Sequence, residues 1–527
     1  MADQKRIVII GAGAVGTNAA LVFDKKGFKV TLLERTDDIL VGGGVATTNI
    51  THSDGFEYHK PDHRTTGEYC IDGSITKSLL FPSHIYLTKT CSVDKPIRFF
   101  VSIDSENKDG LTPENFAKNA EHMRQHFHKQ FEHLSKSRGG VARAEKLLGR
   151  NPETFAHPLK PEEYAECKNI VCGYAGSGTG VNMPQYYAML KALLKSSNVD
   201  FQSKQNVTKI EKQKNGYYNI TSNGRVIKAD HIVIATAHQV PEICAKIENA
   251  EFKKKDGNRS AEGTYYLNSM TYVRLPATSD KKKIADVSRL NFTLQGDGGC
   301  MFACILPPTD KEDGYGAIYY PSEKGSQFQK HIYDKENTSP PPVQWEDYIK
   351  KGLPSEHPHV SATMQQAYRY YPFLKDYAEV DKTICRTVFN AATPDSDKGL
   401  ERRVRGIIDA DVITADGHIT AFRSPKWTNS ELVALMAVDQ AMQSLGKGEL
   451  PKNKEHGFGP TNLDIEQITR DLNFQNVKME IKDALNFARK NKLPERLIDK
   501  ALYEFKPIPK RASIIEHEVV QRSNYLR

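Results

Sequence analysis

The chain has 527 residues, of which 39% are hydrophobic and 26% are charged, a composition typical of a globular protein with a buried core. Its 73 lysines and arginines exceed its 65 aspartates and glutamates by 8, an excess too widely spread to indicate a nucleic-acid-binding protein. No run of roughly 18 apolar residues, no signal peptide and no cysteine pattern is visible in the sequence. We therefore expect a cytoplasmic protein with reduced thiols and no integral membrane segment, for which peripheral membrane contact stays open.

The first 34 residues contain a nucleotide-binding pattern. Residues 6–10 (RIVII) predict a strand buried on both faces, and a glycine-rich turn with Gly11, Gly13 and Gly16 follows it and opens a helix. After a second predicted strand, Glu34 stands 18 positions beyond Gly16. This order of strand, glycine turn, helix, strand and acid is the dinucleotide-binding fingerprint.

Each residue of the fingerprint has a physical task. Gly11 allows the tight turn, Gly13 lets the backbone approach a pyrophosphate, and Gly16 lets the helix pack closely on the strand. Glu34 would accept hydrogen bonds from the ribose of adenosine and would repel a 2′-phosphate, which disfavours NADP. These residues taken alone also fit an NAD-dependent dehydrogenase.

A second block lies at 182–238. It predicts a helix over 183–194, a small meander of strands within 207–228, and a second buried strand within 229–237. This last strand ends in the small residues Ala235, Thr236 and Ala237. Because an open parallel sheet presents its ligand crevice at the carboxyl ends of its strands, we expect a ligand there.

A third block lies at 383–445. Its pattern predicts strands at 403–409 and 419–423, a loop at 424–429, and a helix from Ser430 that is apolar nearly all round and therefore buried. The N–H groups of the first helical turn would point toward whatever the loop holds. The blocks at 182–238 and 383–445 speak against an NAD-dependent dehydrogenase.

Together the three blocks resemble the glutathione-reductase-type FAD-binding fold, and within it the D-amino-acid oxidase-like family of FAD-dependent oxidoreductases. The second glycine motif of that family is usually Ala-Thr-Gly, from which this chain departs at Ala237. The resemblance implies FAD as the cofactor and implies no metal. The cofactor-binding residues it implies are Gly11, Gly13, Gly16, Glu34, Arg35, Gly43, Gly44, Thr48, Val207, Ala235, Thr236, Lys426, Trp427 and Thr428.

The implied fold class is α/β, with an FAD-binding domain that is discontinuous along the chain. The expected parts are an FAD-binding domain from 1–60, 170–260 and 383–450, a helical insertion at 61–169, a substrate domain with an antiparallel sheet at 265–380, and a helical C-terminal extension at 451–527.

Two candidate catalytic residues follow from the resemblance. Residues 42–61 are similar to a run in the L-2-hydroxyglutarate and malate flavin dehydrogenases, which implies that His52 is a histidine close to the flavin. A loop histidine without chemistry is the alternative. Arg386 lies in the block that resembles the family's arginine-bearing strand near the flavin. We rank it first for holding a substrate carboxylate, ahead of Arg274, Tyr315 and Tyr319.

The implied reaction is removal of a hydride from the Cα–H of a small carboxylated substrate, either a 2-hydroxy acid or an amino acid, with oxygen, a quinone or another protein as the electron acceptor. The alternative is a non-catalytic protein that keeps the FAD fold as a scaffold for binding. Two other patterns are given no catalytic role. Four histidines of one predicted helix (122, 126, 128 and 133) are interpreted as a solvated face, and the glycine-rich 176–180 lacks the ending of an ATP-binding P-loop and is interpreted as a loop at the mouth of the site.

Overall fold

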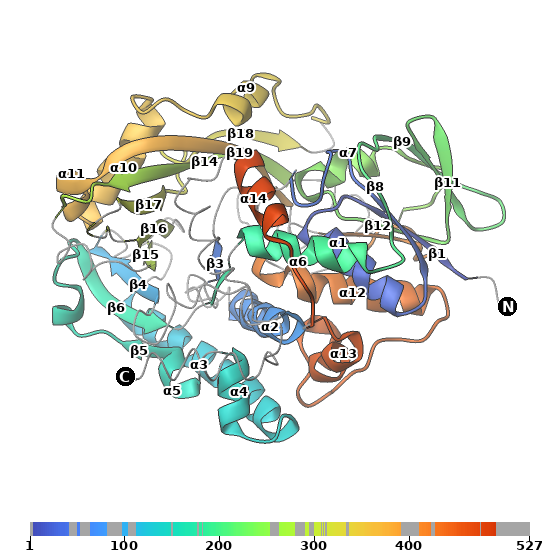
Figure 1. The fold of residues 1–527 in the computed structure, drawn as a ribbon, viewed down its shortest axis with the longest axis horizontal. Coiled ribbons are helices and arrows are strands. Elements are labelled where there is room, and N and C mark those ends of the chain that lie inside the picture. Colours follow the sequence, from blue (N-terminus) through green and yellow to red (C-terminus); the bar gives the residue numbers. More distant parts are fainter. Residues whose placement is uncertain are drawn as a thin grey trace.

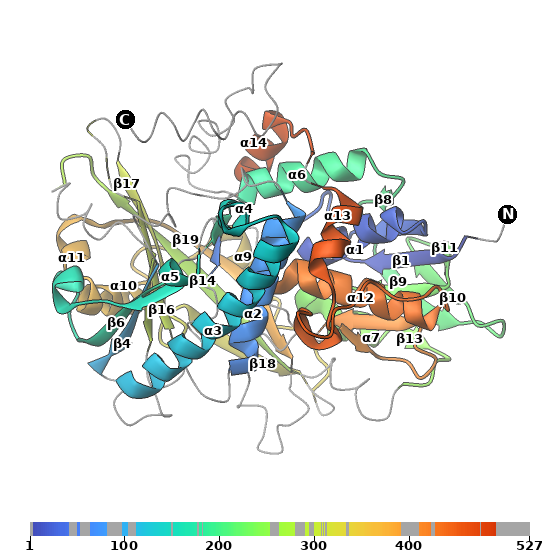
Figure 2. The same ribbon diagram turned by 90° about the horizontal axis from the view of Figure 1, so that it is seen from below.

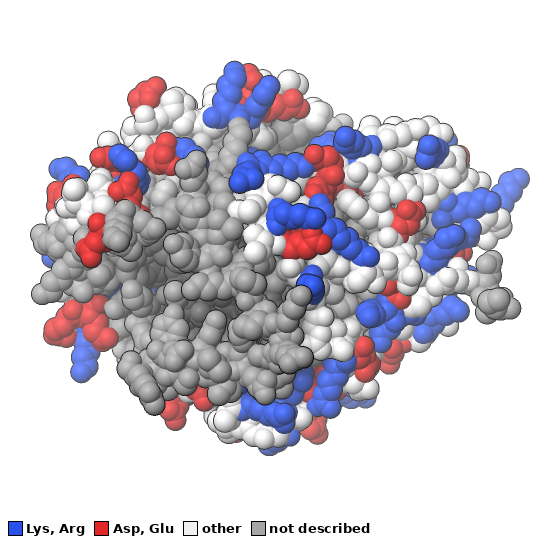
Figure 3. All heavy atoms as spheres, viewed as in Figure 1, with Lys and Arg blue, Asp and Glu red and all other residues white. Residues whose placement is uncertain are grey.

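The structure is a computed structural model, in which two large sheets lie side by side (Figure 1). It describes residues 4–41, 50–52, 64–81, 97–103, 112–148, 151–176, 179–181, 183–252, 263–279, 290–294, 300–306, 308, 310, 313–333, 337–391, 410–422, 427–474 and 476–491. None of the helices within these ranges is long and apolar enough to cross a membrane. Basic and acidic side chains are interspersed over the described part of the face in Figure 3.

The first large sheet has six strands in the order β20-β21-β12-β1-β2-β8. Its centre is β1 (Arg6–Ile10), which pairs in parallel with β2 (Lys29–Leu33) on one side and with β12 (His231–Ile234) on the other. The predicted strands at 6–10 and 229–237 therefore lie in the same sheet. Its remaining strands are β8 (Asp200–Gln202), β20 (Ala410–Val412) and β21 (Ile419–Phe422).

The apolar side chains of β1 alternate between two cores. Ile7 and Ile9 pack on one face against α1 (Ala14–Lys25), α6 (Met183–Lys195) and α12 (Ser430–Ser444). Val8 and Ile10 pack on the other face, which is covered by a four-stranded sheet. That sheet consists of β9 (Val207–Lys212), β10 (Tyr218–Ser222), β11 (Arg225–Ala229) and β13 (Ile247–Glu248). Burial on both faces is the reason for the continuous apolar run of β1.

The second large sheet has nine strands and is mainly antiparallel. Its longest strands, β14 (Gly263–Leu275) and β19 (Glu379–Ala391), pair along their whole length. Leu267 of β14 and Cys385 of β19 pack against a layer of helices. The helices on this side are α9 (Gln344–Lys351), α10 (Pro358–Tyr370) and α11 (Phe373–Tyr377). The other strands are β4 (Ile97–Ser102), β5 (Ala156–Pro158), β6 (Ile170–Gly176), β15 (Leu290–Leu294), β16 (Cys300–Leu306), β17 (Gly314–Tyr319) and β18 (Gln327–Tyr333).

The strand pairing bears on the expected division of the chain. The range 61–169, expected to be a helical insertion, holds helices and also β4 and β5, which join the nine-stranded sheet. Two strands expected in the FAD-binding domain, β6 and β19, also belong to that sheet. The helices of this range are α2 (Arg64–Leu80), α3 (Pro113–Ser137), α4 (Val141–Leu148), α5 (Pro152–Phe155) and η5 (Pro161–Tyr164). The domain boundaries stay a prediction.

The described residues from 459 to 490 pack on the side of the parallel sheet (Figure 2). They form η8 (Gly459–Thr461), α13 (Ile465–Leu472) and α14 (Ile481–Lys490). Phe487 of α14 stacks on Tyr187 of α6, with 4.7 Å between the ring centroids. Residues 492–527 of the expected helical extension and the predicted strand at 403–409 lie outside the described residues.

Candidate active site

The glycine-rich turn joins β1 to α1 beside the end of β12. Gly11 has φ +99°, and a Cβ on it would lie 2.7 Å from the carbonyl oxygen of Ala235. A Cβ on Gly16 would lie 1.9 Å from the carbonyl oxygen of Gly11. By contrast, a Cβ on Gly13 would meet only the Ala235 oxygen, at 3.9 Å, among the described residues. Packing within the chain therefore requires glycine at 11 and 16, and leaves space at 13 for a ligand.

Glu34 lies directly after β2 with its carboxylate beside this turn. The carboxylate accepts hydrogen bonds from the backbone N–H groups of Ala12 (2.7 Å) and Thr36 (2.8 Å), and from the Thr36 hydroxyl (2.9 Å). These bonds hold the carboxylate beside the N-terminus of α1, where the fingerprint places a ribose. With its amide oriented so that the oxygen faces Arg35, Gln239 accepts a hydrogen bond from the Arg35 guanidinium (2.9 Å).

The segment after β12 leaves polar atoms unpartnered. Within the described residues, Thr236 Oγ1 and His238 Nδ1 are buried and have no hydrogen-bond partner. Burial, aided by the charge of Arg35, lowers the pKa of His238 to about 4, so the ring is neutral near pH 7. Orphaned polar atoms beside Gly11 fit a bound nucleotide. Sequence reasoning missed His238, because a histidine after a strand carries no signal of its own.

Ala237 stands where the family usually has glycine, and the backbone shows what the departure means. It begins η6 (Ala237–Gln239) with φ +49°, a left-handed conformation that favours glycine. Alanine is close to glycine in size but carries backbone strain here. The last candidate of this region, Val207, begins β9, and its carbonyl accepts a hydrogen bond from Lys246 Nζ (2.9 Å).

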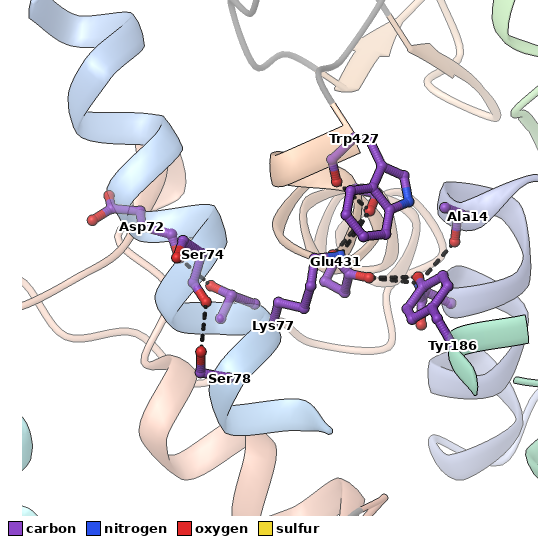
Figure 4. Close-up of polar contacts among 11 residues, drawn as sticks. Ala14, Asp72, Ser74, Lys77, Ser78, Tyr186, Trp427 and Glu431 are labelled. Atoms are coloured by element: carbon purple, nitrogen blue, oxygen red, sulfur yellow. Dashed lines mark hydrogen bonds and ion pairs between the residues drawn. The ribbon is translucent and has the colours of Figure 1, made fainter. Parts of the chain in front are cut away.

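A buried ion pair lies at the N-terminus of α12 (Figure 4). Lys77 of α2 and Glu431 of α12 form a salt bridge with side chains only 1% and 0% exposed. The other Glu431 oxygen accepts from the Tyr186 hydroxyl of α6 (2.6 Å) and from Asn18 Nδ2 of α1 (3.2 Å). Four helices on one face of the parallel sheet are thereby tied together at a single carboxylate.

Two of the predicted cofactor residues adjoin this ion pair. Trp427 and Thr428 lie in η7 (Trp427–Asn429), directly before α12. Lys77 Nζ lies 4.2 Å from the centroid of the Trp427 ring, a cation–π contact, and Thr428 is buried. Four other predicted residues, Gly43, Gly44, Thr48 and Lys426, lie outside the described residues.

The backbone of His52 is described, whereas its side chain is not. It ends β3 (Ile50–His52), a short strand seen between the two large sheets in Figure 1. β3 pairs with β7 (Thr179–Val181), and His52 lies opposite Thr179. Part of the glycine-rich 176–180 therefore lies beside the candidate catalytic histidine, a pairing that the sequence did not indicate.

The candidates for holding a substrate carboxylate lie on the nine-stranded sheet and differ in whether they already have partners within the chain. Arg274 is 51% exposed and forms ion pairs with Asp313 and Glu379. The hydroxyl of Tyr315 donates to Asp381 at 2.6 Å. These groups are already engaged within the chain.

Arg386 differs from them. One of its Nη atoms donates to the carbonyl of Cys385 (3.1 Å), and its Nε is buried without a partner among the described residues. In those residues no carboxylate pairs with it. Burial lowers the pKa of Arg386, yet a guanidinium keeps its charge at physiological pH. It is a partly buried cation with a buried Nε, and the described part of the chain does not supply its counter-charge.

The histidines of α3 have more contacts than a solvated face implies. His122 lies 2.7 Å from Glu68, and His126 lies 2.7 Å from Asp72, both carboxylates coming from α2. His133 stacks on the ring of His456, with centroids 4.5 Å apart. The expectation was wrong for His122 and His126, because packing of α2 on α3 brings carboxylates to them. The described residues contain no cluster of three or more side chains able to hold a metal ion.

Comparisons with known proteins identify the family. Residues 6–440 match the sequence model of the family described as DAO, FAD dependent oxidoreductase. The chain belongs to this family: it is an FAD-dependent oxidoreductase and its cofactor is FAD, not NAD. The family match does not single out the L-2-hydroxyglutarate subgroup. No curated protein sequence matches the chain.

Solved structures agree with this fold. L-alpha-glycerophosphate oxidase from Mycoplasma pneumoniae, with FAD bound, is 15% identical with a TM-score of 0.51 over 83% of this chain and 95% of its own. Glycine oxidase from Geobacillus kaustophilus is 12% identical with a TM-score of 0.51 over 87% and 99%. L-proline dehydrogenase from P. horikoshii is 14% identical with a TM-score of 0.51 over 89% and 99%. The parallel sheet with its helices and the antiparallel sheet are typical of this fold.

Proposed function

We propose that the chain oxidises a small carboxylated substrate at its Cα–H, either an amino acid or a 2-hydroxy acid. The observation that carries the proposal is the partly buried guanidinium of Arg386, whose Nε is buried and which lacks a carboxylate partner within the described residues. Its strand β19 contacts η6, the segment that follows the nucleotide strand β12. A carboxylate bound to Arg386 would therefore lie on the side of the sheet that adjoins the cofactor domain.

Different groups of the chain would bind the cofactor and the substrate. The N-terminus of α1 and the space at Gly13 would hold the pyrophosphate, Glu34 would hold the ribose, and the first turn of α12 would lie at the flavin ring. When bound there, FAD would supply the acceptor for the hydride. Arg386 would orient the substrate through two parallel hydrogen bonds to its carboxylate, which fixes the Cα–H toward the cofactor.

The two substrate classes differ in the proton that must leave. A hydroxy acid loses its hydroxyl proton as the hydride departs, and a histidine has the pKa suited to accept it. We assign that role to His52, in line with the hydroxy-acid subgroup. An amino acid in its neutral form needs less help. Two structures of similar fold are a glycine oxidase and an L-proline dehydrogenase, which favours the amino-acid class.

The test is anaerobic mixing of the flavin-loaded protein with a panel of 2-hydroxy acids and amino acids while the visible absorbance of the flavin is followed. Bleaching by at least one carboxylated compound is expected. Return of the absorbance with air identifies oxygen as an acceptor, and return only with a quinone identifies a dehydrogenase. Bleaching by uncharged alcohols or amines but by no acid would refute the proposal.

If a 2-hydroxy acid bleaches the flavin, His52→Gln should lower its turnover by roughly 10²-fold, the usual scale for loss of a general base, at unchanged flavin content. Stopped-flow rates of flavin reduction measure this effect. Equal rates in both proteins would remove His52 from the mechanism and leave the carboxylate site standing.

A further inference from the structure

The segment that follows β2 connects the glycine-rich turn with the last described helix. Glu34 begins this segment, and its carboxylate accepts a hydrogen bond from the N–H of Ala12 in the turn (2.7 Å). We infer that α14 holds the segment 34–38 in place and thereby sets how tightly the protein binds FAD. The inference rests on the assignment of Glu34 to the ribose of FAD and does not depend on which substrate is oxidised. The family match ends at residue 440, so α14 lies beyond it.

The chain after β2 is bonded to the glycine-rich turn at two places. Besides the bond from Ala12 to Glu34, the N–H of Leu40 donates to the carbonyl oxygen of Ala12 (2.9 Å). Between them, the hydroxyl of Thr36 lies 2.9 Å from the Glu34 carboxylate and 3.0 Å from the carbonyl oxygen of Asp38. A carboxylate accepts about four hydrogen bonds, and Ala12 and Thr36 already supply three to Glu34. The position of this segment therefore decides where the remaining place for a ribose hydroxyl lies.

Two side chains of α6 hold Asp38. The carboxylate of Asp38 accepts a hydrogen bond from the Tyr187 hydroxyl and another from Lys191 Nζ (2.5 Å). Lys191 also donates to the Tyr187 oxygen (2.8 Å), so each of the three side chains contacts the other two. Burial raises the pKa of the Tyr187 hydroxyl, and the bond to Asp38 adds to the effect, so the phenol stays a donor. The position of Asp38 thus depends on the position of Tyr187.

α14 lies along α6 and contacts both Tyr187 and the segment itself (Figure 2). The ring of Phe487 stacks on the ring of Tyr187, with 4.7 Å between the centroids and 27° between the planes. Phe487 is only 2% exposed, so this stack is buried. In the last turn of α14, Lys490 forms an ion pair with Asp37. α14 therefore supports the side chain that holds Asp38 and also binds its neighbour in the segment.

The physical reason for an effect on FAD is preorganisation of the segment. α14 has 10 residues, too few for a stable helix by itself in water, so its order depends on packing against α6. A binding segment that is already fixed costs less free energy to order when the ligand binds. If α14 lowers this cost, FAD must in return stabilise α14, because coupling between two sites is reciprocal. A helix that only buries apolar surface would show neither effect.

Hydrogen exchange tests this reciprocity in the unmodified protein. The flavin-free and the FAD-loaded protein are compared by mass spectrometry. Exchange of the amides of 481–490 should slow roughly fivefold when FAD binds, a typical scale for coupling between packed elements. Slower exchange in 11–16 shows that FAD has bound, and α10, in the helical layer on the nine-stranded sheet, is the control whose exchange should not change. Unchanged exchange in α14 while 11–16 is protected would overturn the inference.

Phe487→Ala tests the contact itself. The flavin-free protein is titrated with FAD, and quenching of the flavin fluorescence gives the dissociation constant, which should rise roughly fivefold. The matched control is Phe155→Ala, which removes another buried ring, stacked on Phe127 at 4.2 Å. Its helices α5 and α3 lie apart from α14 in Figures 1 and 2, so it should lower the melting temperature similarly but change the dissociation constant by no more than about twofold. Equal weakening in both variants would show a general loss of stability and would overturn the inference.

Two further variants locate the effect. Asp38→Ala removes the carboxylate that Tyr187 holds, and its loss of FAD affinity should not add to that of Phe487→Ala, because both break the same chain of contacts. Glu34→Ala should weaken FAD binding roughly tenfold or more, the scale for loss of a hydrogen bond to a charged group. Loss of affinity in Glu34→Ala with full affinity in Phe487→Ala would refute the inference alone, and full affinity in Glu34→Ala would refute the ribose assignment. If Phe487→Ala does not fold, the exchange experiment decides.

Discussion

Two cations of this molecule, Lys77 which is buried and Arg386 which is partly buried, differ in whether the described residues supply a counter-charge. Lys77 lies between four helices and is paired with Glu431, a hydroxyl and two aromatic rings. Arg386 lies on the face of a sheet, and the described part of the chain gives it no carboxylate. Removal of Glu431 would leave Lys77 buried without a counter-charge, whereas Arg386 is the cation for which we propose a carboxylate ligand.

Most polar atoms of the cluster around Lys77 and Glu431 have hydrogen-bond partners among the described residues. Glu431 receives four donors, from Lys77, Ser430, Tyr186 and Asn18. Burial raises the pKa of the Tyr186 hydroxyl well above its usual value, and the charge of Glu431 adds to the effect, so the phenol stays a donor. One atom of the cluster, Asn18 Oδ1, has no partner among the described residues. These contacts join α1 to α12, the two helices whose N-termini we assign to FAD.

The largest change in the free energy of unfolding is expected at the cluster around Lys77 and Glu431. Lys77→Met should lower the free energy of unfolding by about 3–5 kcal/mol, because it leaves the Glu431 carboxylate buried without a counter-charge. Urea titration measures it. Lys77→Met combined with Glu431→Gln should recover most of the loss, since neither charge is then left alone. A double variant as unstable as the single one would contradict the role of the charge pair.

The glycine turn offers a similar comparison. The chain itself fills the space beside Gly16, whereas it leaves space beside Gly13 for a ligand. Gly16→Val should prevent folding, because its Cβ would overlap the Gly11 carbonyl. Gly13→Val should fold and yet purify without visible flavin absorbance, because the added atoms fill the space assigned to the pyrophosphate. Circular dichroism and the visible spectrum separate the two outcomes. A Gly13→Val protein that keeps its flavin would show that the pyrophosphate lies elsewhere.

Substitutions of Arg386 test the cation that has no carboxylate partner among the described residues. Arg386→Met should leave the free energy of unfolding of the ligand-free protein within about 1 kcal/mol or raise it, since it removes a partly buried cation that has no counter-charge among the described residues. Arg386→Lys should mainly raise KM for the acid, because a point charge replaces a two-donor fork. Melting curves and steady-state kinetics check both effects. A loss of several kcal/mol in Arg386→Met would place it with Lys77 as a structural cation.

The smallest effect is expected at Ala237. Ala237→Gly should raise the free energy of unfolding by about 0.5–1 kcal/mol, because glycine adopts φ +49° without the strain that alanine carries. The matched control is Ala235→Gly, two residues earlier and outside the left-handed region, which should lower stability by a similar amount. If both substitutions destabilise equally, the left-handed backbone at Ala237 costs nothing.

Much of the parallel-sheet side was predictable from the sequence. The strands β1, β2 and β12, the glycine turn and the buried helix α12 each follow from patterns within about 20 neighbouring residues, such as an apolar run or a glycine spacing. The FAD cofactor followed from the order of these patterns and agrees with the family match. Local signals of this kind depend on backbone preference and burial. Glycine spacing shows the first in the sequence, and apolar runs show the second.

The composition of the candidate site was not predictable in the same way. Lys77 and Glu431 are 354 positions apart, and neither lies in a motif. The sequence placed residues 383–391 with the FAD-binding domain, but their pairing with β14 puts Arg386 on the nine-stranded sheet, opposite Asn268. The hydroxyl of Tyr319 accepts hydrogen bonds from Asn268 and Gln327, and the local sequence pattern around neither residue predicts this. Such contacts arise only when strands and helices distant in sequence pack together, because strand register and helix packing decide which polar groups find partners within the chain and which are left for a ligand.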